Sequence, residues 1–316
     1  MKTRLMVLSG GNSFEREISL QSAKEVLKHI DTKKYNVKSI NVPPKKDIQW
    51  IKDILEFSPH LILNLLHGGY GEDGSVAGLL NCLGIPSIGN RVLSGSVCMN
   101  KNMCKTVLKN NGVPVCDDVF IKKEHNIIDY EEKIKELGFP VIVKPNNGGG
   151  SIGISIAHNI SDTRIAIDNI IENYSDDIII EKFISGREVT CVVAEKNNEL
   201  SVLPVLDVSA DNGFYDYNAK YVDTSSKLEF STLPEFMRKM IEDIARKVFI
   251  TFECRGLCCV DLIVKDEQVY FIEVNTIPGF TPNSTVTRTL DKLNINIGDF
   301  LDSLIENEIC KESKNE

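Results

Sequence analysis

Apolar residues in the first 90 positions follow two alternating patterns. The runs Arg4–Leu8, Tyr35–Val42 and Leu61–Leu65 are continuous or alternate with polar residues, which predicts strands. Between the first two runs, Phe14–Ile30 has apolar residues every three or four positions, which predicts a helix. Strands alternating with helices are typical of an open, mostly parallel sheet, and such sheets bind ligands beyond the carboxyl ends of their strands.

The middle of the chain predicts a smaller α+β unit around a glycine-rich loop at residues 146–153. Its expected helices and strands are, in chain order, Lys101–Asn110, a strand near Val119, Tyr130–Leu137, Pro140–Lys144, Asp162–Asn173 and Ile178–Phe183.

From about Gly186 the pattern changes to longer strands, with an irregular stretch at Ser209–Ser226. The expected elements are the strands Glu188–Glu195 and Leu200–Leu206, the helix Pro234–Phe249 and the strand pair Leu257–Val264 and Gln268–Asn275. These shifts predict three domains, over residues 1–97, 98–185 and 186–316, and a fold class that combines α/β and α+β parts.

Composition narrows the class of protein. The chain has 316 residues, of which 42% are hydrophobic and 26% charged, as expected for a globular protein of two or three domains. The net charge of −9 argues against a nucleic-acid partner. No apolar run is long enough to span a membrane, and Met1–Gly10 does not have the pattern of a signal peptide. The nine cysteines have no regular spacing, so we expect reduced thiols and a cytoplasmic protein.

The most informative segment is the strand pair near the C-terminus. With a turn centred on Glu267, Asp261 lies opposite Glu273, and Asn275 lies on the same face as Glu273. The Cβ atoms of opposed residues lie roughly 4.5–5.5 Å apart, so the two carboxylates repel unless a cation neutralises them. Oxygen ligands favour Mg²⁺, with Mn²⁺ as a second possibility, and Mg²⁺ in such sites usually also binds phosphates. The alternative is an ordinary amphipathic hairpin with its acidic face in solvent.

A second candidate site is the glycine-rich loop that follows Lys144. Consecutive backbone N–H groups in such a loop bind anions, and Lys144 adds a positive charge, so the pattern indicates phosphate binding. The loop lacks the Gly-Lys-Ser/Thr of a Walker P-loop, and the alternative is a flexible hairpin tip. The strand Ile178–Phe183 becomes polar at its end, where backbone groups and the carboxylate of Glu181 can be presented to an adenine and its ribose, and Glu188 follows in residues 186–190. Taken singly, each of these is also compatible with a solvated strand end.

Two loops follow strands of the N-terminal sheet. In residues 9–17, Glu15 is placed either to hold a substrate ammonium group or to interact with the dipole of the following helix. In residues 66–74, four glycines accompany His67, Glu72 and Asp73, which indicates either a close-approach site or a plain Ω-loop.

Together and in this order, the motifs resemble the D-alanine–D-alanine ligases of the ATP-grasp superfamily. The matching segments span nearly the whole chain and are Gly10-Gly11, residues 15–20, Leu66-His67-Gly68, residues 71–74, Met99-Asn100-Lys101, residues 140–145, Glu181-Lys182, residues 214–217, Ala219-Lys220-Tyr221, residues 273–276 and residues 278–281.

The resemblance implies a three-domain ATP-grasp architecture with an N-terminal substrate-binding domain, a central lid and a C-terminal catalytic domain. It implies an enzyme that uses ATP and two Mg²⁺ ions to phosphorylate one amino acid and to couple the acyl phosphate to the amine of a second. The implied role in the cell is peptidoglycan synthesis, and the implied assembly is a homodimer.

The resemblance also implies roles for individual residues. The implied ATP contacts are Lys101, Lys144, Glu181, Lys182, Ile184, Glu188 and Lys220, and the implied metal ligands are Asp261, Glu273 and Asn275. The implied catalytic residues are Glu15, Ser151, Tyr221 and Gly279, with Glu15, His67 and Ser284 contacting the amino acids. Tyr221 would lie on a mobile loop, residues 209–226, that closes over the site.

Three positions depart from the family pattern, all on the amino-acid side of the site. Cys259 replaces an arginine that stabilises the tetrahedral intermediate, Gly150 replaces the first of two serines, and Thr285 replaces a leucine. Losing one oxyanion donor typically lowers the rate on the order of 10²–10³-fold. Arg187, Arg255 and Arg288 are the candidates to supply the missing charge. The departures leave open a ligase for another amino acid or hydroxy acid, and a nucleotide-binding homologue without the coupling step.

Overall fold

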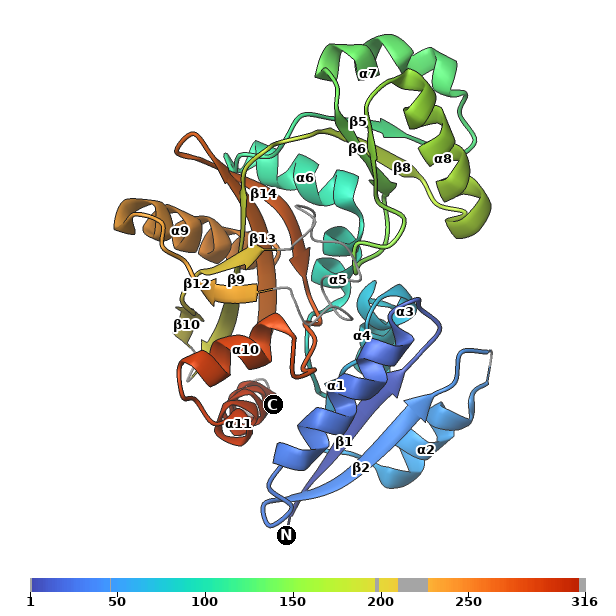
Figure 1. Ribbon diagram of the computed structural model, residues 1–316. Helices are drawn as coiled ribbons and strands as arrows, with labels where there is room; N and C mark the ends of the chain where they lie inside the picture. The colour runs from blue at the N-terminus through green and yellow to red at the C-terminus, as the bar shows by residue number, and fades with distance from the viewer. Residues whose placement is uncertain (1, 46, 197–198, 210–226, 313–316) are drawn as a thin grey trace.

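The computed structural model describes residues 2–45, 47–196, 199–209 and 227–312, which fold around three sheets (Figure 1). The N-terminal sheet lies at one end of the molecule, a four-stranded sheet forms the lobe at the other end, and a six-stranded sheet lies between them. We call these the N-terminal sheet, the lid sheet and the large sheet.

The N-terminal sheet is parallel, as the alternating pattern predicts. Its strands, in spatial order, are β2 (Tyr35–Val42), β1 (Thr3–Gly10), β3 (Leu61–Asn64) and β4 (Ser87–Ile88). Its helices are α1 (Arg16–His29), α2 (Gln49–Phe57), α3 (Gly69–Glu72) and α4 (Ser75–Cys82). Both faces of β1 are buried, because Leu5 and Val7 pack into one hydrophobic cluster and Met6 and Leu8 into another.

The lid sheet is antiparallel and its two faces differ. Its strands, in spatial order, are β5 (Asp118–Ile121), β8 (Ile178–Lys182), β6 (Val141–Pro145) and β7 (Ser155–Ala157). One face packs against α7 (Glu131–Leu137), α8 (Ile160–Tyr174) and the short 3₁₀ helix at Ile127–Tyr130. Because side chains alternate along a strand, Lys144 and Glu181 lie on the opposite face.

The large sheet carries helices on both faces. Its strands are β9 (Arg187–Lys196), β10 (Glu199–Val202), β11 (Leu206–Ser209), β12 (Lys227–Phe230), β13 (Leu257–Lys265) and β14 (Gln268–Asn275). One face packs against α9 (Glu235–Thr251), α5 (Val92–Met99) and α6 (Lys101–Asn110). The other face packs against α10 (Thr285–Lys292), α11 (Ile297–Glu312) and the N-terminal sheet.

The prediction of one strand over Leu200–Leu206 is wrong. The segment forms two strands, β10 and β11, which both pair with β9 but at different positions along it. Pro204 lies in the break, and a proline has no N–H group to donate to a neighbouring strand. The chain therefore leaves the sheet edge at Pro204 and returns two residues later.

The hairpin of β13 and β14 combines one confirmed prediction with one error. Asp261 pairs with Glu273, as predicted, but the turn is not centred on Glu267. It is the two-residue turn Asp266-Glu267, whose φ angles of 48° and 61° are typical of a type I′ turn. Such a turn alone would pair Asp261 with Ile272, and a β-bulge at Ile272 shifts the register by one residue.

The bulge decides where the polar side chains of β14 point. Before it, Val269 and Phe271 face the hydrophobic core, and after it Val274 does. Without the extra residue, Glu273 would continue on the core face with Phe271. The bulge therefore turns Glu273 and Asn275 to the face that carries Asp261.

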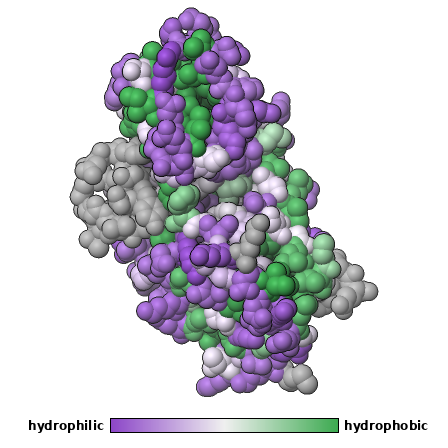
Figure 2. Space-filling view, turned by 90° about the vertical axis from the view of Figure 1, so that its right-hand side faces the viewer, coloured by the Kyte–Doolittle hydropathy of each residue, from purple (hydrophilic) through white to green (hydrophobic). Residues whose placement is uncertain are grey.

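All nine cysteines are free thiols, seven buried and two exposed. Hydrophilic side chains predominate on the surface in Figure 2, and hydrophobic ones form a band along the upper lobe, which contains the lid sheet. No helix within the described ranges has both the length and the apolar character needed to cross a membrane.

Candidate functional site

A cavity of about 220 Å³ lies where the lid sheet, the large sheet and the loops of the N-terminal sheet meet. Residues from all three parts of the chain line it, although they are more than 200 positions apart in sequence. The predicted site residues that line it are Glu15, His67, Lys144, Ser151, Glu181, Lys182, Ile184, Glu188, Asp261, Glu273, Asn275, Gly279 and Ser284.

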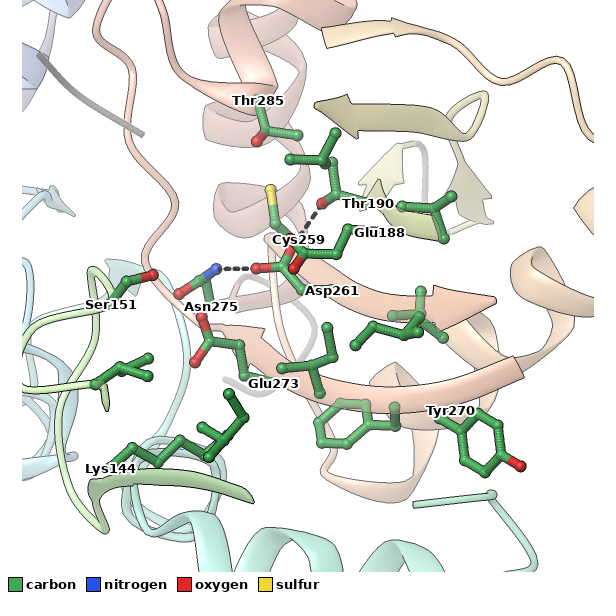
Figure 3. A pocket seen from close by; sticks show the side chains of 18 of the residues that line it. Lys144, Ser151, Glu188, Thr190, Cys259, Asp261, Tyr270, Glu273, Asn275 and Thr285 are labelled. Carbon is green, nitrogen blue, oxygen red and sulfur yellow. Dashed lines mark hydrogen bonds between the residues drawn. The ribbon is translucent and has the colours of Figure 1, made fainter. Parts of the chain in front are cut away.

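Asp261 lies at the centre of the large-sheet wall of this cavity. One carboxylate oxygen accepts a hydrogen bond of 2.7 Å from Thr190 Oγ1, and the other accepts one of 3.4 Å from Asn275 Nδ2. Glu273 lies beside this pair on β14 (Figure 3), and Lys144 of the lid sheet lines the same cavity. A carboxylate pair next to a lysine is an arrangement that suits a divalent cation and phosphate oxygens.

The donor set is compatible with a hard divalent cation. The ligand atoms that Asp261, Glu273 and Asn275 supply are oxygens, which suits Mg²⁺ better than a metal that prefers thiolate ligands. Across the described part of the chain, no three His, Cys, Asp or Glu side chains group as a metal site. A cation here therefore depends on the amide oxygen of Asn275 as the third protein ligand.

The lid face of the cavity carries a buried ion-pair network around Glu181. One oxygen of Glu181 lies 2.9 Å from Lys144 Nζ and the other lies 3.0 Å from Lys105 Nζ. Burial raises the pKa of Glu181, but the ammonium groups of Lys144 and Lys105 more than offset this and lower it to about 2. Glu181 is therefore an ionised carboxylate held in a fixed position.

The predicted phosphate ligand Lys101 does not line the main cavity. It lines a small adjoining hollow together with Lys144, Ser151 and Glu273, and its ammonium donates to the carbonyl of Gly148 in the glycine-rich loop. Burial lowers the pKa of Lys101, and the nearby charge of Glu273 opposes this. Lys220 and Tyr221, predicted for ATP and for catalysis, lie outside the described residues.

The glycine-rich loop lies directly on the carboxylate of Glu15. A Cβ atom at Gly149 would be 2.8 Å from Glu15 Oε2, and one at Gly150 would be 2.9 Å from Glu15 Oε1. Gly150 also has a φ of +64°, which an L side chain rarely adopts. In this conformation, a serine at position 150 has no room unless Glu15 moves.

His67 is almost fully buried in the N-terminal wall of the cavity, in the loop next to Glu15. Its Nε2 lies 3.3 Å from Ser22 Oγ, and burial lowers its pKa to about 4, so the imidazole is neutral at pH 7. Gly279 brings the backbone close to this wall, because a Cβ there would be 2.6 Å from Ser284 Oγ and 3.5 Å from His67 Nε2.

Two residues that the sequence motifs do not assign to the site contact its predicted members: Thr190 donates to Asp261, and Lys105 pairs with Glu181. Glu72, from the loop at residues 66–74, lines the cavity and accepts hydrogen bonds from the backbone of Thr276 and Ile277. Lys105 lies one helical turn after Lys101, and Thr190 lies two residues after Glu188 on the same strand face, so both spacings are visible in the sequence.

Arg187, Arg255 and Arg288 do not line the cavity. Arg187 pairs with Asp207 and Thr232, and Arg255 lies 3.2 Å from Glu308. Cys259 itself lies on the cavity wall with its sulfur directed towards Thr285 (Figure 3). Arg187 and Arg255 are thus directed to other partners, and Arg288 is not among the residues that line the cavity.

Comparisons with known proteins agree along nearly the whole chain. The family model for the D-ala D-ala ligase N-terminus matches residues 4–60, and the model for the D-ala D-ala ligase C-terminus matches residues 107–306. D-alanine–D-alanine ligase A of Bacillus cereus is 34% identical over 305 residues, which cover 96% of this chain and 97% of the relative. D-alanine–D-alanine ligase B of Clostridium perfringens is 37% identical over 309 residues, with 98% and 99% covered.

The fold is similar to solved structures of the same kind. The crystal structure of D-alanine–D-alanine ligase from Bacillus anthracis complexed with ATP superposes with a TM-score of 0.86 and 28% sequence identity. The superposition covers 99% of this chain and 100% of that structure.

Proposed function

The chain belongs to the D-alanine–D-alanine ligase family, and we propose that it joins two molecules of D-alanine with the residues that line the cavity between its three sheets. It is an ATP-dependent ligase that forms a peptide bond and acts in cell-wall peptidoglycan synthesis. The observation that carries the residue assignment is the paired carboxylates Asp261 and Glu273, which line one cavity together with Lys144.

We propose that ATP binds between the lid sheet and the large sheet. Lys144 and Lys101 provide positive charge for the phosphates, and the backbone N–H groups of the glycine-rich loop lie over them. Lys182 ends β8 and Ile184 follows it, and both offer backbone groups to the adenine. Glu188 lies further along the same wall for the ribose. Lys220 is assigned to the phosphates on the family motif alone.

Asp261, Glu273 and Asn275 are proposed to hold Mg²⁺, with two ions bound, because their oxygen atoms share one face of the hairpin. When bound, Mg²⁺ neutralises the two carboxylates and the charge that develops on the transferred phosphoryl group. Thr190 donates to Asp261 and so orients this carboxylate.

We propose that the amino acids bind on the opposite side of the cavity. Glu15 is buried and positioned to hold the ammonium group of the first D-alanine, beside His67 and Ser151. Gly279 and Ser284 form the wall nearest to the second D-alanine. Tyr221 is assigned to catalysis on the family motif alone.

The reaction then proceeds in two steps. A carboxylate oxygen of the first D-alanine takes the γ-phosphoryl group of ATP, which releases ADP and forms an acyl phosphate. The amine of the second D-alanine, after losing a proton, attacks the acyl carbon, and inorganic phosphate leaves. Lys144 and Lys101 stabilise the charge on the phosphoryl oxygens, and the cavity walls keep water from the acyl phosphate.

The test is phosphate release from ATP and Mg²⁺ with a panel of D- and L-amino acids and D-hydroxy acids. We expect turnover with D-alanine alone and a dipeptide product. Turnover only with another pair would replace D-alanine as the substrate, and ATP binding without turnover on any pair would reject the ligase assignment for this chain. Cys259→Arg tests whether restoring the family's arginine raises the rate.

We propose a cytoplasmic location because the reaction needs ATP and the thiols are free, and a homodimer because the chain resembles its family throughout. Light scattering coupled to size-exclusion chromatography tests the second proposal, and a mass of one protomer of 35.3 kDa would reject it.

A further inference from the structure

Lys105 is a buried lysine that contacts none of the proposed substrates. It lies on α6, only 2% exposed, and it does not line the cavity. Its ammonium nitrogen lies 3.0 Å from Glu181 Oε1, 3.0 Å from Asp118 Oδ1 and 3.4 Å from Cys116 Sγ. Lys105 therefore contacts Glu181 from behind the cavity wall.

The register of the lid sheet explains why a cation is needed at this point. Asp118 on β5 pairs directly with Glu181 on β8, so two carboxylates lie opposite each other on one face of the sheet. Opposed like charges destabilise a sheet and raise carboxyl pKa values. Lys105 contacts both carboxylates and so neutralises this pair from within the protein.

Lys144 shares the same carboxylate. Its ammonium lies 2.9 Å from the second oxygen of Glu181, and it is also the residue proposed to bind the phosphates of ATP. An ammonium group that turns to a phosphate weakens its contact with Glu181. A buried carboxylate that loses a partner carries a large desolvation cost unless another cation remains.

Helix α6 provides a rigid base for this second cation. Cys104 and Leu108 of α6 pack into the core of the large sheet, while Lys105 on the same helix reaches the lid sheet. Lys105 thus joins the two sheets that form the walls of the nucleotide site. Within residues 2–45, 47–196, 199–209 and 227–312, the other charged or titratable groups around Glu181 include Lys144, Lys101, Asp118 and Cys116.

We propose that Lys105 is a positioning residue for the nucleotide: it keeps Glu181 ionised and in place, which frees Lys144 to exchange Glu181 for the phosphates of ATP. This inference rests on the proposed ATP site and adds a residue to it. It predicts that loss of Lys105 weakens ATP binding and leaves the binding of amino acids unchanged.

The test compares Lys105→Met with the wild-type protein by calorimetric titration with ATP in the presence of Mg²⁺. We expect at least a tenfold weaker affinity for ATP, because Lys144 then has to leave a buried carboxylate that no other cation of the described residues contacts. Repeating the titration at pH 7 in buffers of different ionisation enthalpy measures proton exchange. The variant should take up more protons than the wild type, because Glu181 becomes protonated when Lys144 leaves it.

The pH dependence provides a second readout. Because ATP binding to Lys105→Met requires proton uptake, its affinity relative to the wild type should fall by at least threefold from pH 6 to pH 8. In steady-state assays the KM for ATP should rise while the KM for each amino acid stays within twofold. A purely structural role for Lys105 does not produce this proton linkage.

Two further variants serve as controls. Lys105→Arg keeps the positive charge and should retain ATP affinity within about threefold. Lys135→Met removes a lid lysine that pairs with Glu132 at the surface, and it should change nothing. If Lys105→Met does not fold, Lys105→Met/Asp118→Asn removes one charge of each sign and should show the same loss of ATP affinity.

The inference is wrong if a folded Lys105 variant without the charge binds ATP within twofold of the wild type, or binds it weakly without extra proton uptake. Failure of the wild-type protein to bind ATP with Mg²⁺ would instead overturn the proposed function. The two failures are therefore distinguishable in one set of titrations.

Discussion

At the scale of single residues, Gly150 and Gly84 form a natural matched pair. Their φ angles are +64° and +65°, but a Cβ at Gly150 would meet Glu15, whereas one at Gly84 would meet nothing within 4 Å. A side chain at either position carries the same backbone strain, on the order of 1–2 kcal/mol. Only Gly150 couples that strain to a proposed substrate contact.

We therefore expect Gly150→Ala to raise the KM for the first amino acid by roughly tenfold or more, because small displacements of a positioning group are costly. Gly84→Ala and Gly150→Ala should lower the free energy of unfolding by similar amounts, because the backbone strain is the same at both positions. Gly84→Ala should leave the KM values unchanged. Steady-state kinetics and urea unfolding of both variants measure this. Equal KM values for Gly150→Ala and the wild type would show that Glu15 does not bind the amino acid.

His67 predicts a pH-dependent stability. Its pKa falls from about 6.5 in the unfolded chain to about 4 in the folded one, so between these values the unfolded chain binds more protons. The stability associated with neutral, buried His67 is thus fully present above pH 6.5. It is lost progressively as the pH falls from 6.5 towards 4, because protonation then favours the unfolded chain. At pH 5 the loss is roughly 2 kcal/mol.

Urea unfolding at pH 7 and pH 5 measures this loss. His67→Gln should reduce the difference between the two pH values by about the same 2 kcal/mol. His158→Gln, at an exposed position, should leave the difference unchanged. An unaltered pH dependence in His67→Gln would show that other groups cause it.

At the scale of elements, the hairpin of β13 and β14 builds the carboxylate wall by two local devices. The type I′ turn sets one register and the bulge at Ile272 shifts it, so that Asp261 and Glu273 meet on the cavity face. Bulges commonly lie next to active sites, where they redirect a side chain. The turn itself uses Asp266 and Glu267, although glycine is preferred at the second position.

Because Glu267 has a φ of 61°, we expect Glu267→Gly to raise the free energy of unfolding by up to about 1 kcal/mol. Urea unfolding measures the gain, and ATP binding should not change because the turn lies away from the cavity lining. Glu267→Ala keeps the strain and is the matched control. A loss of stability in the glycine variant would contradict the assigned turn.

At the scale of the whole molecule, Glu72 joins the N-terminal loops to the large sheet. Its Oε1 accepts hydrogen bonds from the backbone N–H groups of Thr276 and Ile277 at 3.0 and 3.2 Å, and Oε2 accepts one from Gly68 at 3.0 Å. The residue pairs that it joins are about 200 positions apart. This contact connects the loops proposed to bind the amino acids with the turn that follows the proposed metal-binding hairpin.

We expect Glu72→Ala to lower the free energy of unfolding by about 2–4 kcal/mol, because several donors lose a charged acceptor. Asp73→Ala, which removes an acceptor for Ser75 within the same loop, should cost about 1 kcal/mol. Urea unfolding compares the two. A second unfolding transition in Glu72→Ala would show that the N-terminal sheet has become independent of the large sheet.

The sequence alone determined the features of the fold that depend on residues close together in the chain. The alternation of apolar positions predicts the parallel N-terminal sheet and the helix Lys101–Asn110, because side-chain period and capping are local properties. The same reasoning predicts that Asp261 faces Glu273, although the predicted turn is wrong and the bulge restores the pairing.

Only the tertiary structure decided which side chains far apart in the sequence contact each other. Lys105 meets Glu181 across 76 positions, and Glu72 meets Thr276 across 204. Whether an arginine replaces the charge missing at Cys259 was also decided by packing, since Arg187 and Arg255 pair with other carboxylates. The spacing of residues along the sequence does not show which group a buried charged side chain will contact. That partner is whichever group the folded chain brings within a few ångströms.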